Sequence, residues 1–329
     1  MRDVANAAGV SLKTVSRVVN NEASVTAGLE QRVRSAIRAL GYQPDDRARY
    51  LRRAATGSRS LGFVQTDVAN PFFAAMFRGL EDVVRAEGFL VFAGSSDADP
   101  DREEELVRAF IARRVDGLVI ASARSDLSFL AAEVEHGTPL VFVDLEPAID
   151  LGDVVRTDHY GGAAMATRHL LEHGHRRIAF LGDSPMFFSA RERRRAFVDV
   201  MAEAGCPTPW LLTDLTTPEE SEAAAHELLN RADRPTALFT AQNFVTIGAV
   251  KAMHGLGVQH EIALVGFDDV DIAELVEPKL TVVPQDPGAL GRLAGERLFA
   301  RLASTGRPFE RTVLESKLIP RGSGEIRPS

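Results

Sequence analysis

The N-terminal residues best suited to chemistry lie in the short segment 12–20. Its valines recur at helical spacing, which predicts an amphipathic helix with a polar outer side. Leu12, Lys13 and Arg17 project from that side. The Arg17 guanidinium can pair bidentately with O6 and N7 of guanine, Lys13 can contact a base edge, and Leu12 can contact a thymine methyl. These three side chains are therefore candidates for reading bases in a DNA major groove.

Short polar side chains on and around this helix can donate hydrogen bonds to phosphates. They are Ser11, Thr14, Ser16, Asn20 and Thr26. Ser11 is also placed to cap the N-terminus of the helix. The alternative interpretation is that these residues only cap and solvate a surface helix.

Two more helices are predicted beside this one. The first covers 3–8 and ends at Gly9, which suits a left-handed C-cap. The third begins near Thr26 and ends before Gly41. A helix, a tight turn with glycine and a second helix are typical of a helix-turn-helix motif.

Charge separates the N-terminal segment from the rest of the chain. Residues 1–59 contain 11 Lys or Arg and five Asp or Glu, a net charge of +6, whereas the whole chain of 329 residues carries −8 and the remainder therefore −14. A basic head on an acidic body indicates that only the head meets a polyanion. Between them, residues 44–60 read as a linker, with five arginines and Leu51 as the one large aliphatic side chain.

From Leu61 onward, apolar runs alternate with amphipathic helices such as 71–87 and 102–113. The predicted strands are 61–64, 89–92, 117–120, 140–143, 178–181, 237–240 and 262–265. Continuous apolar strands joined by helices indicate parallel sheets covered on both faces. The series is too long for one sheet, so we predict two lobes that divide near 155–158. Ligands of such sheets bind beyond the carboxyl ends of the strands, which places a site in the cleft between the lobes.

Motifs along nearly the whole chain resemble the LacI/GalR (lactose/galactose-repressor) family. They include Ala8-Gly9-Val10-Ser11, Gly41-Tyr42-Gln43-Pro44, Asn70-Pro71-Phe72-Phe73, Gly174-His175-Arg176-Arg177 and Val265-Gly266-Phe267-Asp268. The resemblance implies an all-α helix-turn-helix headpiece over 1–43, a hinge helix over 44–59 and an α/β, periplasmic-binding-protein-like domain over 60–329. Its first lobe would comprise about 60–156 plus 287–314, and its second about 157–286 plus 315–322.

The function implied by this resemblance is that of a sequence-specific transcription repressor. Two copies would bind a pseudo-palindromic operator, and a small polar effector would control their affinity for it. In the hinge, Leu51 matches a leucine that wedges into the minor groove, and Arg49 would contact phosphate. The alternative for Leu51 is that it packs on its own lobe.

The resemblance also assigns a set of effector-binding positions in the cleft. They are Phe72, Phe73, Asp144, Asp158, Arg193, Gln242, Asn243, Asp268 and Gln285. Carboxylates and a guanidinium can grip vicinal hydroxyls, and aromatic faces can stack on a sugar or a base. The alternative is that Asp144 and Asp158 only cap helices and that Arg193 is a solvated surface residue.

Several positions depart from the family pattern. Asp45-Asp46 replaces Asn-Ala at the start of the hinge, Gln242-Asn243 replaces Asn-Asp, and His159 replaces the asparagine that follows the crossover aspartate. Losing a carboxylate at 242–243 suggests a ligand that takes amide contacts there. A sugar or related polyol is the expected effector, with a purine-like or phosphorylated ligand as the alternative.

Enzyme function is not expected, because G-x-G-x-x-G after the first strand, P-loop and G-x-S-x-G motifs are all lacking. His169, His173 and His175 are unevenly spaced, so we expect them to flank solvent rather than hold zinc. No metal or cofactor is expected.

The remaining alternative is a periplasmic solute-binding protein without a regulatory role. It would need an export signal, and residues 1–6 do not resemble one. No apolar run approaches the length of a membrane span, and the single Cys206 fits a reducing compartment. We therefore expect a cytoplasmic protein.

Overall fold

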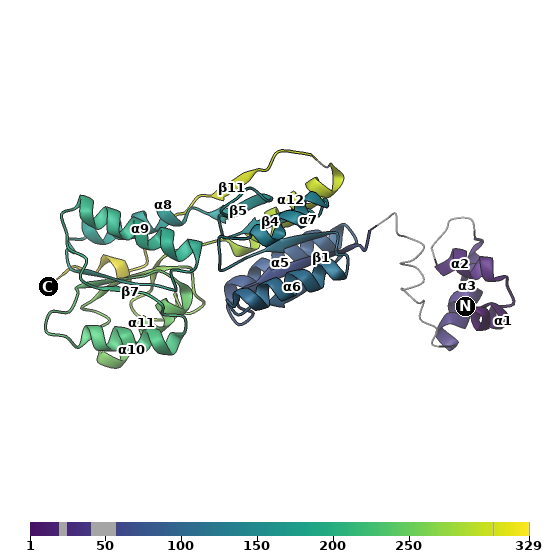
Figure 1. Cartoon of the computed structure of the whole chain (residues 1–329). Coiled ribbons are helices and arrows are strands. Elements are labelled where there is room, and N and C mark those ends of the chain that lie inside the picture. The colour runs from purple at the N-terminus through teal and green to yellow at the C-terminus, as the bar shows by residue number, and fades with distance from the viewer. Residues whose placement is uncertain (20–24, 41–56, 305, 329) are drawn as a thin grey trace. The chain divides into compact units, whose positions relative to one another are not determined.

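The computed structural model describes residues 1–19, 25–40, 57–304 and 306–328. The chain divides into two compact units, Met1–Ser58 and Arg59–Ser329 (Figure 1). Residues 20–24 and most of the predicted hinge lie outside the described residues, so Asn20, Arg49 and Leu51 stay sequence predictions.

The first unit contains α1 (Arg2–Ala8), α2 (Leu12–Val19) and α3 (Ala27–Ala39) in its described part. As predicted, Gly9 ends α1 in the left-handed conformation, with φ of 59°, and its N–H bonds back to the carbonyls of Ala5 and Asn6. One side of each helix meets in a small apolar core, formed by Val4, Ala5, Ala8, Val15, Val18, Val33 and Ala36. Three short helices are marginal alone, so this shared core holds α2 in place.

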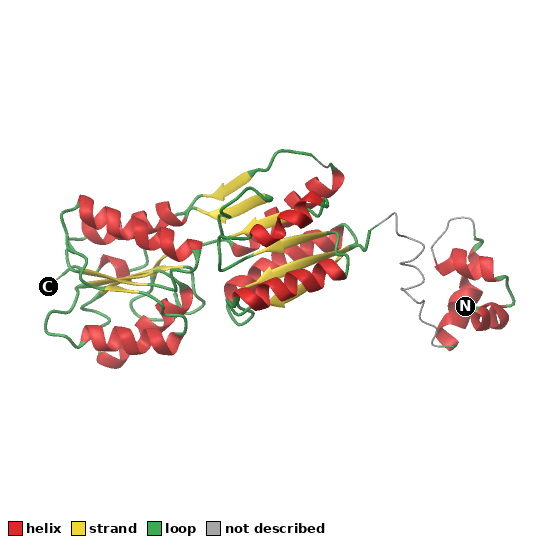
Figure 2. Cartoon of the chain, viewed as in Figure 1, coloured by secondary structure: helices red, strands yellow, loops and turns green. Residues whose placement is uncertain are grey.

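The first lobe of the second unit is built on a parallel six-stranded sheet in the order β11-β5-β4-β3-β1-β2. The strands are β1 (Ser60–Gln65), β2 (Leu90–Ser95), β3 (Gly117–Ile120), β4 (Leu140–Val143), β5 (Asp153–Thr157) and β11 (Arg311–Leu314). Helices cover both faces (Figure 2), as expected for a parallel sheet whose strands β1, β3 and β4 are buried along their length.

Each face of this sheet has its own helix layer. On one face, α5 (Pro71–Ala86) and α12 (Pro287–Ala303) pack over a core that includes Met76, Leu80 and Leu290. On the other, α6 (Pro100–Ala112) and α7 (Ala131–Glu135) cover a second core, and the short turn η1 (Ser128–Leu130) precedes α7. The helices α5 and α12 approach so closely that a Cβ atom at Gly291 would lie 2.0 Å from the Met76 carbonyl oxygen.

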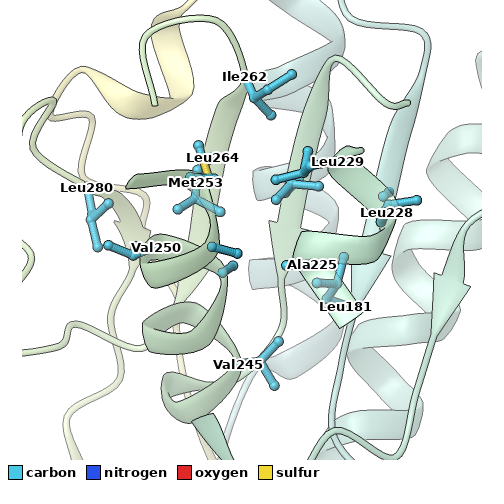
Figure 3. Close-up of a cluster of buried hydrophobic side chains, with 14 of the residues drawn as sticks. Leu181, Ala225, Leu228, Leu229, Val245, Val250, Met253, Ile262, Leu264 and Leu280 are labelled. Carbon is cyan, nitrogen blue, oxygen red and sulfur yellow. The ribbon is translucent and has the colours of Figure 1, made fainter. Parts of the chain in front are cut away.

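The second lobe has a parallel five-stranded sheet in the order β10-β9-β8-β6-β7. Its elements are β6 (Ile178–Leu181), β7 (Leu211–Leu212), β8 (Ala237–Thr240), β9 (Ala263–Phe267), β10 (Thr281–Val283), α8 (His159–Glu172), α9 (Phe188–Glu203), α10 (Pro218–Leu229), α11 (Asn243–Leu256) and η2 (Ser323–Glu325). Figure 3 shows part of the core beneath α10 and α11, with Leu228, Val245 and Leu264 among its buried side chains. The helices α8 and α9 cover the opposite face.

The expected fold class, a helical headpiece with a two-lobed parallel α/β domain, is confirmed. Four strands were not predicted: β5, β7, β10 and β11. Polar Asp153 and Arg156 interrupt β5, β11 is a partly exposed edge strand, and β7 and β10 are only two and three residues long. The second lobe also extends past the predicted end at 322, because Ile326 packs on its core.

The chain passes between the lobes after β5, after β10 and after β11, so the crossover segments lie beside both sheets. The second and third carry Gln285 and Ser316. All strands within each sheet are parallel, so the carboxyl ends of both sheets can contribute to one cleft.

Candidate functional site

The exposed side of α2 carries the residues predicted to read bases. Val15 and Val18 face the headpiece core, while Leu12 is 48% exposed and Lys13 is also exposed at the start of the helix. Arg17, one turn later, is half-buried and lies on the same outer arc as Lys13 at 100° per residue. The exposed Leu12 beside Lys13 and Arg17 offers an apolar contact for a base methyl next to two hydrogen-bond donors.

The residues predicted to contact phosphates flank this arc. Ser11 caps α2, because its Oγ accepts a hydrogen bond from the Thr14 N–H at 3.1 Å, and the two hydroxyls are 2.9 Å apart. Thr26 is exposed at the start of α3, and Ser16 is half-buried on α2. On α3, Arg34 pairs with Glu30 at 2.8 Å, so part of the positive charge of that helix is neutralised internally.

A cavity of about 450 Å³ lies between the carboxyl ends of the two sheets. Most of the residues that line it follow β1, β2 and β4 in the first lobe and β6, β7, β8, β9 and β10 in the second. Of the predicted effector residues, Phe72, Phe73, Asp144, Arg193, Gln242, Asp268 and Gln285 line it. This volume is suited to a small molecule of about the size of a sugar or a nucleoside.

Arg193 forms the buried base of the cavity and is 4% exposed. Its Nη1 donates to the Ala241 carbonyl at 2.8 Å, its Nη2 lies 3.2 Å from Nδ1 of His159, and its guanidinium stacks over the Phe267 ring at 3.9 Å. Its Nε has no hydrogen-bond partner among the described residues. Arg193 lines the cavity, and a buried N–H without a partner is a candidate donor to a ligand oxygen.

His159, the residue that departs from the family pattern, connects Arg193 to Asp144. Burial lowers the pKa of His159, against the effect of the Asp144 carboxylate, so the ring is neutral. Because Nδ1 accepts from Arg193, Nε2 carries the proton and faces Asp144 Oδ1, 2.8 Å away, although the two atoms are not aligned for a hydrogen bond. Asp144 therefore keeps capacity to accept a hydrogen bond from a ligand.

Asp268 is fixed by groups from two other segments. Its Oδ2 accepts from the Asn243 N–H at 3.1 Å at the start of α11, and its Oδ1 accepts from Gln285 Nε2 at 2.7 Å. Asp144 and Asp268 both have left-handed backbones, with φ of 60° and 74°. Aspartate tolerates this conformation better than most residues, and it directs each strand-end side chain away from the strand path.

Two predicted effector residues have other contacts in the structure. Asp158 is the N-cap of α8, where it accepts from the Gly161 N–H at 2.9 Å, and it is absent from the described lining of the cavity. Asn243 is buried in a reciprocal pair with Asn70, with amide contacts of 2.7 and 3.3 Å that join α11 of one lobe to α5 of the other. Asp158 therefore caps α8, and Asn243 joins the lobes.

The expectation that the three clustered histidines flank solvent is wrong for His175. That residue is fully buried, with Nδ1 2.9 Å from Thr236 Oγ1 and Nε2 2.7 Å from the Ile326 carbonyl oxygen. His169 Nε2 lies 2.5 Å from Glu325 Oε1. The C-terminal segment folds back over these rings, which nearby sequence could not indicate. Within the described chain, no group of three or more His, Cys, Asp or Glu side chains is arranged to hold a metal ion.

Sequence reasoning missed other residues that line the cavity, most importantly Asp183. It lies two residues after β6, whereas Asp144 and Asp268 each follow their strands directly. Burial raises the pKa of Asp183 to about 6. Phe187 and Phe244 add aromatic surface to that of Phe72 and Phe73, whose rings meet edge to face with centroids 5.3 Å apart. The available signal was the position of Asp183 just beyond an apolar strand.

Comparisons with known proteins bear on both units. The headpiece, residues 1–45, matches the family described as bacterial regulatory proteins of the lacI family, and residues 167–324 match the periplasmic binding protein-like domain. The HTH-type transcriptional repressor PurR of Mannheimia succiniciproducens is 30% identical over 328 residues, covering 98% of each chain. The HTH-type transcriptional regulator GalR of Salmonella typhimurium is 32% identical over 328 residues, covering 98% of this chain and 95% of GalR.

Solved structures give the same result. The Lac repressor dimer bound to operator and the anti-inducer ONPF superposes with a TM-score of 0.86 at 26% identity, covering 98% of each chain. The complex of the transcriptional regulator CelR with cellobiose gives 0.73 at 28% identity, again over 98% of each chain. These relatives are regulators, which confirms that the chain is not an enzyme. Among the described residues, no helix is both long enough and apolar enough to cross a membrane.

Proposed function

This chain belongs to the lacI family of bacterial regulatory proteins, and we propose that it represses transcription under the control of a small polyhydroxylated effector bound in the cavity. The observation that carries this proposal is the 450 Å³ cavity at the carboxyl ends of both sheets, in a chain that also carries a helix-turn-helix. Without the headpiece, the same cavity would suit a solute-binding protein with no regulatory role.

Operator recognition is assigned to the outer arc of α2. Arg17 and Lys13 would contact base edges, Leu12 a thymine methyl, and Ser11, Thr14, Ser16 and Thr26 the phosphates. Support comes from the exposure of Leu12 and Lys13 and from a headpiece that matches the lacI family over residues 1–45. Asn20, Arg49 and Leu51 are assigned from sequence alone.

We propose that two copies act together on a pseudo-palindromic operator in the cytoplasm, where the DNA is. The dimeric, operator-bound state of the similar Lac repressor supports this assembly. In a two-fold symmetric dimer, the headpieces would reach successive major grooves of the DNA. Effector binding would change the relation of the lobes and, through the hinge, the affinity for operator.

Effector contacts are assigned to seven of the predicted residues: Phe72, Phe73, Asp144, Arg193, Gln242, Asp268 and Gln285. The cavity presents both donors and acceptors of hydrogen bonds, which supports a polyol as the effector. Arg193 Nε and Gln285 Oε1 lack hydrogen-bond partners within the described chain, so a ligand hydroxyl, which both donates and accepts, can satisfy either one. The cellobiose complex of the similar CelR supports a sugar.

The decisive experiment is an unbiased selection of operators from random duplexes with the full chain, followed by binding titrations with sugars and nucleosides. We expect one enriched palindrome-like sequence and at least one ligand that changes its affinity. The Arg193→Ala variant should keep operator binding but lose the ligand response, while Arg195→Ala, at an exposed arginine paired with Glu192, should keep both. Absence of any enriched sequence, with or without ligands, would refute the proposed function.

A further inference from the structure

The cavity has a strong excess of negative charge. Five carboxylates line it, and the only cationic side chain in its described lining is Arg193. The carboxylates belong to Asp67, Asp97, Asp144, Asp183 and Asp268. Even if one carboxyl is protonated, an anionic ligand would meet a net negative field in a partly desolvated site.

The Arg193 guanidinium has few N–H donors left for an anion. Two of its nitrogens already contact the Ala241 carbonyl and His159, and its face lies on Phe267. Only Nε is left without a partner in the described chain, and Arg193 is 96% buried. Strong phosphate sites use several donors or a bidentate fork, whereas this arrangement offers a single N–H, which suits one ligand hydroxyl.

Asp183 is a cavity carboxylate that forms no ion pair within the described residues. Asp97 pairs with Arg102, Asp268 accepts from Gln285 and the N-terminus of α11, and Asp144 faces His159. Asp183 Oδ1 accepts from the adjacent Ser184 N–H at 2.6 Å, and Asp67 Oδ1 accepts in a similar way from the Ala69 N–H at 2.8 Å.

The groups around Asp183 add to the excess of negative charge near its carboxylate. Asp214 and Asp268 lie close enough to raise its pKa, Arg193 acts the other way, and burial is the largest cause of its shift to about 6. A half-buried, partly desolvated carboxylate that is ionised at neutral pH is stabilised by a nearby cation.

We propose that the effector carries an ammonium group that pairs with Asp183, together with hydroxyls that reach Arg193 Nε and Asp144, as in an amino sugar. This inference rests on the proposed function and specifies the ligand of its cavity. Phe72, Phe187 and Phe244 would pack against the apolar face of the sugar ring. A phosphorylated sugar is excluded by the same field that favours the amine.

Matched sugars test the charge preference without changing stereochemistry. For glucose, galactose and mannose, the unmodified hexose, its amino derivative and its phosphorylated derivative are titrated calorimetrically into the full chain near neutral pH. We expect at least one amino sugar to bind about tenfold or more tightly than its parent hexose, because it adds a charge-assisted contact. The phosphorylated member should not bind.

Variants of the chain then test whether Asp183 causes the preference for the amino sugar. Asp183→Asn keeps the side-chain shape and should bring the amino sugar to within about twofold of the parent hexose, whose own affinity should be retained. Asp214→Asn is the comparison variant, because Asp214 is exposed and is held by Ser184 and Thr213. It should reduce the preference only slightly. In the unaltered chain, affinity for the amine should also fall as the pH is lowered through about 6, because Asp183 becomes protonated.

Three results would overturn the inference: tighter binding of a neutral or phosphorylated member, a preference for the amine that survives Asp183→Asn, or no binding of any amino sugar. Retained circular dichroism of Asp183→Asn separates a lost preference from a lost fold. If a neutral sugar binds and changes operator affinity, the regulatory function stands and only the amine is rejected. If the chain enriches no operator, the regulatory function itself fails.

Discussion

At the scale of single residues, side chains of the same type have different roles because their surroundings differ. Asp144, Asp158 and Asp183 all lie near the ends of strands. Asp158 caps α8, Asp144 faces a neutral histidine, and Asp183 lines the cavity without a salt bridge in the described chain. Burial raises the pKa of Asp183 to about 6, so its effect on stability can be tested by changing the pH.

Arg17→Ala should remove most of the discrimination between operator and scrambled DNA. Loss of a bidentate contact to guanine costs about 1 to 3 kcal/mol, or roughly five- to 150-fold in relative affinity. Fluorescence anisotropy titrations of both duplexes at one salt concentration measure this ratio. Arg78→Ala, at an exposed α5 arginine in the other unit, is the control. A mutant that discriminated as well as the parent would exclude Arg17 from base reading.

Asp183 should also make stability depend on pH. Its folded-state pKa, about 6, is raised above the ordinary value of 3.8, so the folded state favours the protonated form. Its stabilising contribution is therefore complete below about pH 4 and is lost as the pH rises through about 6. Relative to Asp183→Asn, the unaltered chain should lose on the order of 1 kcal/mol of unfolding free energy between about pH 5 and pH 8. A difference that stayed constant with pH, measured by urea unfolding, would contradict the shift.

At the scale of elements, the cavity depends on how helices pack against the sheets. The N-terminus of α5 begins at Asn70 and carries Phe72 and Phe73, so the position of this helix fixes one wall. Its place is set by contact with α12, where glycines allow the two backbones to approach closely. Side chains larger than hydrogen cannot be accommodated there without displacement.

Gly291→Ala should therefore destabilise the effector domain. The new Cβ would lie 2.0 Å from the Met76 carbonyl oxygen, which is backbone and cannot rotate away. Overpacking of this kind costs about 1 to 3 kcal/mol or more, so thermal unfolding should shift to lower temperature. Gly255→Ala on α11 is the matched control, because nothing lies within 4 Å of its new Cβ. It should leave stability unchanged or raise it by about 0.5 to 1 kcal/mol. Equal midpoints for both variants would show that α5 and α12 can separate freely.

At the scale of the whole molecule, the 450 Å³ cavity is formed by two lobes that exchange the chain at three crossovers. Asn70 and Asn243 join the lobes directly, and Arg191 of α9 donates to Ser125 of the first lobe at 2.9 Å. A ligand held by Asp144 on one lobe and Arg193 on the other therefore favours one lobe arrangement over others. Differential binding of this kind is what couples an effector to an operator.

Thermodynamic linkage makes that coupling reciprocal. The factor by which the effector changes operator affinity should equal the factor by which operator DNA changes effector affinity. Calorimetric titration of effector with and without saturating operator, compared with operator titrations with and without saturating effector, gives both factors. Unequal factors would mean that the two ligands do not share a single equilibrium. Both operator titrations should weaken steeply with added salt, because phosphate contacts release counterions.

Local patterns in the sequence were sufficient for the architecture. Helical spacing predicted α2, Gly9 marked the end of α1, and apolar runs predicted the seven strongest strands, because periodicity and caps are properties of neighbouring residues. Seven of nine expected effector residues line the cavity, since strand ends in parallel sheets converge there.

Tertiary structure decided the rest. It turned Asn243 toward Asn70, buried His175 under the C-terminal segment and left Asp183 facing the cavity. Each outcome depends on which distant segment lies against a side chain, and therefore on how much water and which partners remain to it. Those quantities exist only once the two sheets are packed, so no spacing along the chain contains them.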